Sequence, residues 1–163
     1  MRTPTLLALF CSLALTACGD SAATLDTGYE ALRDGDHAGA VTAFDSVLAG
    51  LEKGTPEFKQ ACMGRIQALA HVDAEKAKET FMAEAAGGGM TAKDYGDVVT
   101  EFYAVGSEEA QVAAIDILHA GSESLAGDPT IKKMLDKAIA DAEKNLDGAA
   151  AKALSGLGYL GGE

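Results

Sequence analysis

Histidine and cysteine are the side chains best suited to metal binding or nucleophilic chemistry, and this 163-residue chain has three of each. His37, His71 and His119 are far apart, and none has a second histidine or a cysteine at the spacing of a metal site. Cys62 lies next to a methionine inside an expected helix, a setting typical of a small buried apolar side chain. The sequence therefore predicts no catalytic residues, no metal ligands and no cofactor.

The three histidines are expected to have structural roles. His37 follows a Gly-Asp turn at a position usually filled by an aromatic ring, which favours packing. His71 lies beside Asp73, and we expect a local hydrogen bond there. His119 is expected to end a helix, where the helix dipole favours a positive charge.

The other two cysteines lie in the first eighteen residues. Arg2 is the only charged residue among residues 1–17, and an apolar run covers residues 6–15. This run is too short to cross a hydrocarbon layer of about 30 Å, but it has the length of a signal-peptide core. We therefore expect residues 1–17 to be an export signal.

The signal ends in Leu15-Thr16-Ala17-Cys18, which resembles a bacterial lipobox. The resemblance implies cleavage between Ala17 and Cys18, diacylglycerol on the Cys18 sulfur and acylation of the new amino group. Such acyl chains would hold the protein to a membrane. Asp20 comes one position later than the placement associated with inner-membrane retention, so the expected location is the outer membrane, facing the periplasm. The alternative is an ordinary signal peptide in which Cys18 has no role.

The net charge of the chain is −12. Cleavage after residue 17 leaves 146 residues with a formal charge of −13. Nucleic-acid binding requires clustered positive charge, so the sequence excludes nucleic acid as an expected partner.

The rest of the chain predicts an all-α fold, because alanine is abundant and no segment alternates as a half-buried strand does. Capping residues are expected at Thr55, Asp73, Thr91, Ser107 and Asp128. The expected helices cover residues 24–34, 37–51, 56–70, 74–86, a segment between Thr91 and Gly106, a segment from 108, and a segment from 129 to about 145.

A small residue followed four positions later by a large apolar one recurs with a period of 37 residues. The pairs are Ala40 and Phe44, Ala77 and Phe81, and Ala114 and Leu118. With the preceding Gly-Asp turn, this pattern resembles the tetratricopeptide repeat. The resemblance implies antiparallel helical hairpins in a right-handed repeat, with the seventh helix as a C-terminal cap. The alternative is a generic helical bundle.

These observations divide the chain into four parts: a signal peptide (1–17), a lipidated tether (18–23), a helical repeat-like domain (24–147) and a Gly/Ala-rich tail (148–163).

Helical repeats bind partners on the surface lined by the first helix of each hairpin. Carrying the repeat register along the chain predicts the partner-binding residues Asp26, Tyr29, Arg33, Lys59, Met63, Ile66, Val99 and Tyr103. We therefore expect a lipid-anchored, non-catalytic envelope adaptor or assembly factor that binds another envelope protein or peptide. The alternative is a carrier for a small ligand in a cavity between helices.

Overall fold

The computed structural model describes residues 23–161, and within that range it contains eight α-helices and no strand. The helices are α1 (Leu25–Arg33), α2 (His37–Leu48), α3 (Pro56–Val72), α4 (Ala74–Ala86), α5 (Ala92–Val105), α6 (Glu108–Ser124), α7 (Pro129–Ala142) and α8 (Ala149–Gly156). The prediction of an all-α fold is confirmed.

Side-chain caps set where the helices begin. Each of the first seven helices follows a residue whose side-chain oxygen accepts a backbone N–H from the first turn: Thr24, Asp36, Thr55, Asp73, Thr91, Ser107 and Asp128. The five caps predicted from the sequence are among them. By contrast, α8 begins after Gly148, which offers no side chain for this purpose.

Two helices end earlier than predicted. α2 ends at Leu48 and not Leu51, and α7 ends at Ala142 and not near Asn145. In both places the second and third N–H groups after the helix bond to carbonyls three residues back, so the helix tightens into turns. Gly106 ends α5 as predicted, with a left-handed φ of 76°.

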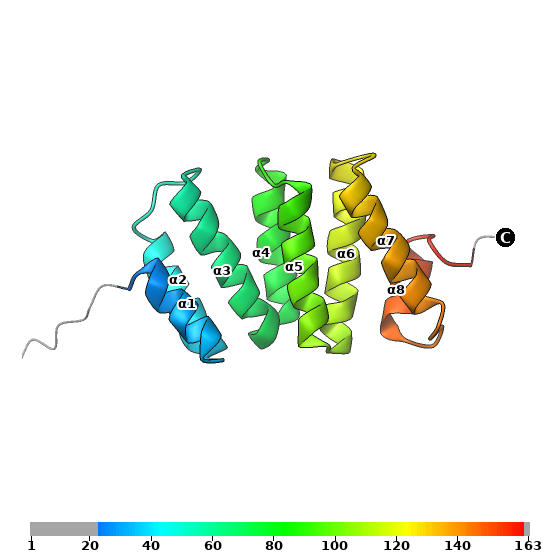
Figure 1. Cartoon of the computed structure of the whole chain (residues 1–163), viewed down its shortest axis with the longest axis horizontal. Helices are drawn as coiled ribbons and strands as arrows, with labels where there is room; N and C mark the ends of the chain where they lie inside the picture. The colour runs from blue at the N-terminus through cyan, green and yellow to red at the C-terminus, as the bar shows by residue number, and fades with distance from the viewer. Residues whose placement is uncertain (1–22, 162–163) are drawn as a thin grey trace, which may run out of the picture.

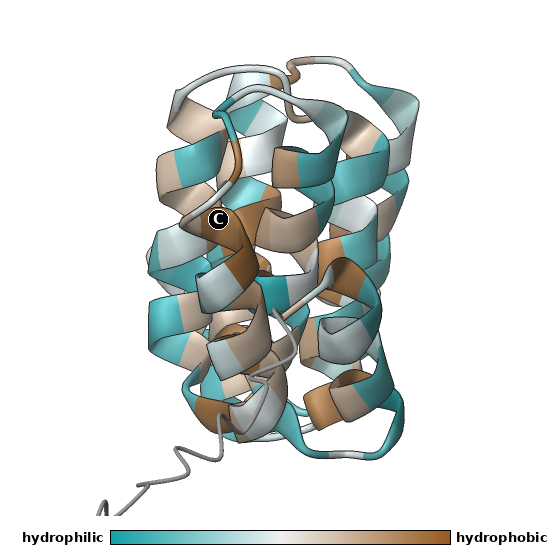
Figure 2. Cartoon of the chain, turned by 90° about the vertical axis from the view of Figure 1, so that its left-hand side faces the viewer, coloured by the Kyte–Doolittle hydropathy of each residue, from teal (hydrophilic) through white to brown (hydrophobic). Residues whose placement is uncertain are grey.

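The helices follow one another in a row, from α1 and α2 at one end to α7 and α8 at the other (Figure 1). Consecutive helices pack as pairs, α1 with α2, α3 with α4, α5 with α6 and α7 with α8. Each odd-numbered helix also packs on the next odd-numbered helix. Among the even-numbered helices, α6 packs on both α4 and α8. The view along the row shows the two resulting layers of helices (Figure 2). The odd-numbered helices therefore form one layer.

The residues that carry the 37-residue period are all fully buried: Ala40, Phe44, Ala77, Phe81, Ala114 and Leu118. They lie in α2, α4 and α6, the second helices of three successive pairs. The right-handed superhelix and the tetratricopeptide relationship stay predictions.

The first hairpin is packed around one aromatic ring. Phe44 of α2 is fully buried and makes a T-shaped contact with Tyr29, with ring centroids 5.1 Å apart. A Cβ at Gly28 would lie 2.6 Å from Phe44 Cε1, and one at Gly64 would also overlap the ring. Glycine at both positions lets α1 and α3 approach this ring closely.

The C-terminal segment differs from the predicted tail. Residues 149–156 form α8, which packs on α6 and α7 with Ala151 and Leu154 buried. These apolar side chains, three positions apart, belong to the larger core, so the helix continues the packing of the preceding domain. The signal peptide, the Ala17–Cys18 cleavage site and tether residues 18–22 lie outside the described range.

Candidate functional site

The layer of odd-numbered helices has three gaps between neighbours, and the first is closed by Tyr29. Its hydroxyl donates a hydrogen bond to the carbonyl of Gln60 on α3 at 3.1 Å. Burial raises the pKa of Tyr29, and the side chain of Gln60 partly offsets that rise. Tyr29 therefore ties α1 to α3.

The second gap, between α3 and α5, is bridged at two places. Lys59 Nζ lies 2.7 Å from Asp94 Oδ2 and donates to the carbonyl of Gly89 at 3.1 Å. Burial opposes ionisation of Asp94, but hydrogen bonds from Lys59 and Thr91 outweigh it and hold the pKa of Asp94 below its usual value. Further along the helices, His71 Nε2 lies 2.8 Å from Glu101 Oε1.

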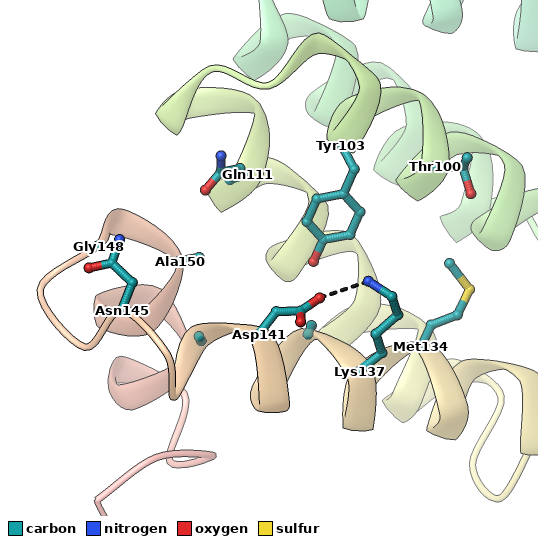
Figure 3. Close-up of a pocket in the computed structure, with 11 residues that line it drawn as sticks. Thr100, Tyr103, Gln111, Met134, Lys137, Asp141, Asn145, Gly148 and Ala150 are labelled. Atoms are coloured by element: carbon teal, nitrogen blue, oxygen red, sulfur yellow. Dashed lines mark hydrogen bonds and ion pairs between the residues drawn. The ribbon is translucent and has the colours of Figure 1, made fainter.

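The third gap, between α5 and α7, has no side-chain hydrogen bond or ion pair across it within residues 23–161. It holds a cavity of about 530 Å³ instead (Figure 3). The lining residues come from α5, α6, α7, the loop after α7 and the start of α8: Thr100, Tyr103, Gln111, Met134, Lys137, Ala138, Asp141, Ala142, Asn145, Gly148 and Ala150. A cavity of this size is within the range of ligand sites, which is about 300–1,000 Å³.

One side of the cavity is aromatic and its floor is small and apolar. Tyr103 projects from α5 toward α7 and is 41% exposed (Figure 3). Opposite it, Ala138 and Ala142 are buried, and Met134 adds a flexible thioether side chain. The alanines of α7 leave space here that larger side chains would fill.

The polar groups of the cavity are concentrated around Asp141. Lys137 and Lys144 both donate to its carboxylate at 2.7 Å, and these bonds lower the pKa of Asp141 to about 2. Burial raises the pKa of Tyr103, and the charge of Asp141 raises it further, so the phenol stays protonated and able to donate. The cavity thus combines an apolar floor with hydrogen-bonding groups at its mouth, the combination that binding pockets use.

Six of the eight predicted partner-binding residues fall into three groups. Asp26, Tyr29 and Arg33 lie together around a surface hollow on α1. Lys59 is held by Asp94, and Met63 is partly buried against the larger core. Of the eight, only Tyr103 lines the cavity between α5 and α7.

Two of the predicted positions are wrong. Ile66 and Val99 are fully buried in the larger core and offer no surface to a partner. The fixed offset of 37 residues carried them onto the inner faces of α3 and α5, because it ignored the other helices that pack on these two.

The sequence reasoning missed the contribution of α7, which it treated only as a cap. Met134, Lys137 and Asp141 of α7 line the cavity, as does Asn145 just beyond its end. The available signal was the spacing of Ala138 and Ala142, small residues one turn apart beside a Lys-Asp pair with the same spacing.

The histidine and cysteine predictions have mixed outcomes. His37 packs against a ring as expected, and Cys62 is buried as expected, with its pKa raised to about 11 mainly by burial. His71 bonds to Glu101 and not to its neighbour Asp73, whose carboxylate caps α4 instead. His119 does not end its helix, which continues to Ser124, and its Nδ1 lies 3.0 Å from the Tyr159 hydroxyl.

Within residues 23–161, no group of three or more His, Cys, Asp and Glu side chains is arranged to hold a metal ion. None of the helices in this range is long and apolar enough to cross a membrane. In comparisons with known proteins, no family model, no curated protein and no solved structure matches this chain.

Proposed function

We propose that this protein is a non-catalytic adaptor that binds a segment of another envelope protein between α5 and α7. The observation that carries the proposal is the contrast among the three gaps of one helical layer. Side chains tie α1 to α3 and α3 to α5, whereas the gap from α5 to α7 has no such tie in the described residues and holds an open cavity of about 530 Å³.

The chemistry of the cavity suits a polypeptide segment. The floor of Met134, Ala138 and Ala142 accepts an apolar side chain, and Tyr103 offers a rigid ring of the kind that often anchors interfaces. The Tyr103 hydroxyl and the Asn145 amide can bond to the polar backbone that accompanies any peptide. An apolar anchor surrounded by hydrogen-bonding groups is the usual pattern of a protein interface.

The sequence of the N-terminus supports a location for this activity. The lipobox-like Leu15-Thr16-Ala17-Cys18 would place acyl chains on Cys18 and hold the helical domain at a membrane, which we propose to be the outer membrane on its periplasmic side. Labelling with radioactive palmitate tests this anchor. We expect label on the wild type and none on Cys18→Ala, and an unlabelled wild type would refute the anchor.

Site-specific photocrosslinking tests the adaptor proposal. A photoreactive phenylalanine analogue replaces Tyr103 at the cavity, and in a control protein it replaces Glu79, which is exposed on α4 in the other layer. We expect a discrete protein adduct from position 103 and none from position 79. Ala138→Leu, which fills the cavity, should remove that adduct. Equal adducts from both positions, or an adduct that survives Ala138→Leu, would contradict the proposal.

The second candidate is a carrier for a small ligand, and the volume of the cavity favours it. Native mass spectrometry distinguishes the carrier from the adaptor. A small molecule that co-purifies with the wild type and is absent from Ala138→Leu, without a protein adduct at position 103, would support the carrier.

A further inference from the structure

Two histidines that are distant in the sequence stack face to face. His37 is the first residue of α2, and His71 lies in the last turn of α3. Their ring centroids are 3.9 Å apart and their planes differ by 3°. His71 Nε2 also lies 2.8 Å from the Glu101 carboxylate on α5. This cluster therefore joins the first hairpin to α3 and α5.

The surroundings of His37 favour its neutral form. Its Nδ1 is buried and has no hydrogen-bond partner among the described residues, so a proton added there would have no acceptor. The ring of His71 covers one face of His37.

The charged groups that act on His37 come from three elements. Asp36 precedes it in the chain, with its carboxylate held by the backbone N–H of Gly39. His71 belongs to α3 and Glu101 to α5. Burial, and then the positive charge of His71, lower the pKa of His37 and together outweigh the opposite pull of Glu101 and Asp36.

We propose that the cluster of His37, His71 and Glu101 is an acid-sensitive latch, which holds the α1–α2 hairpin against α3 and α5 at neutral pH and weakens that hold in acid. When only His71 is protonated, its charge pairs with the Glu101 carboxylate and the His37 ring that stacks on it is neutral. When His37 is protonated as well, two like charges face each other at 3.9 Å.

The direction of the pH dependence follows from linkage. The pKa of His37 in the docked hairpin lies below its usual 6.5, and once the hairpin undocks the pKa returns toward that value. The undocked state therefore binds more protons in mild acid. The contribution of the latch is complete above about pH 6.5 and decreases as the pH falls below it.

Hydrogen exchange of the α1–α2 amides tests the latch. Protection is compared at about pH 7.5 and about pH 5, corrected for intrinsic exchange and referred to the α6 amides. His37→Phe keeps a stacked ring and removes the titration. We expect wild-type α1–α2 protection to fall in acid and His37→Phe protection to stay constant. His119→Gln, which alters a histidine bonded to Tyr159 instead, should behave as the wild type does.

A proton NMR titration keeps the proposal testable if His37→Phe does not fold. The described chain has three imidazoles, so their signals can be assigned by substitution. In the wild type the midpoint of His37 should lie below its usual value of 6.5, and in His71→Gln it should rise. The latch is overturned if the His37 midpoint is unchanged in His71→Gln, or if His37→Phe retains the pH dependence of the wild type.

Discussion

The layer of odd-numbered helices has one gap at each end, between α1 and α3 and between α5 and α7. Side chains fill the first of these gaps and leave the second partly empty. At the first, Phe44 fills the space beneath two glycines and the Tyr29 hydroxyl reaches the Gln60 carbonyl on α3. At the last, Ala138 and Ala142 leave an open cavity beside Tyr103. The comparison shows that one helical arrangement gives a closed junction or an open cavity, according to where the large and small side chains lie.

The largest expected effect compares the aromatic residues of the two ends. Phe44→Ala should lower the free energy of unfolding by about 3–5 kcal/mol, because it removes a fully buried ring from the small core of the first hairpin. Tyr103→Ala should cost less than about 1.5 kcal/mol, since its ring is partly exposed beside an existing cavity. Urea unfolding followed by circular dichroism measures both values. Equal losses would show that the last gap is packed as tightly as the first.

Glycine substitutions should have opposite signs at the two ends. In Gly28→Ala the new Cβ overlaps the Phe44 ring, which should destabilise the protein by about 1–3 kcal/mol. In Gly96→Ala on α5 the new Cβ lies 3.4 Å from the flexible Met134 thioether, and the higher helix propensity of alanine should stabilise by up to about 1 kcal/mol. Thermal unfolding of the two variants checks the signs. A stabilised Gly28→Ala would mean that Phe44 can move aside.

The smallest expected effect concerns the ion pair that closes the middle gap. A double-mutant cycle with Lys59→Met and Asp94→Asn should give a coupling of about 0.5–1 kcal/mol near neutral pH, because the lysine is still partly exposed.

That coupling should also depend on pH in a defined direction. The folded pKa of Asp94 lies below its usual 3.8, so the stability it provides is present above that value and is lost as the pH falls through the folded pKa. Repeating the cycle at decreasing pH checks this. A coupling that is constant into strong acid would show that Lys59 and Asp94 do not interact as a charged pair.

Much of the fold was predictable because its signals are local. A cap such as Thr55 before Pro56, or the pair Thr91 and Asp94, acts within four residues. In the structure α3 and α5 begin directly after these capping residues. The buried pairs of α2, α4 and α6 were predictable for a similar reason, since residues four apart share one face of a helix.

The site was less predictable because it depends on which helices pack together. The register placed Ile66 and Val99 on a surface, yet both are buried beneath helices whose positions the register did not include. The contact of His71 with Glu101 joins residues 30 positions apart, and no local pattern indicates it. Tyr103 was predicted, but the cavity beside it arises from the alanines of α7.

The most direct test of the proposed adaptor is the affinity for the partner captured at position 103, measured by titration calorimetry for two matched variants. Ala138→Leu fills the cavity between α5 and α7, and the double variant Asp26→Ala, Arg33→Ala alters the surface hollow on α1. We predict that Ala138→Leu weakens binding by at least about tenfold, or about 1.4 kcal/mol, and that the α1 variant binds as the wild type does. The reverse result, with binding lost in the α1 variant and kept in Ala138→Leu, would contradict the account.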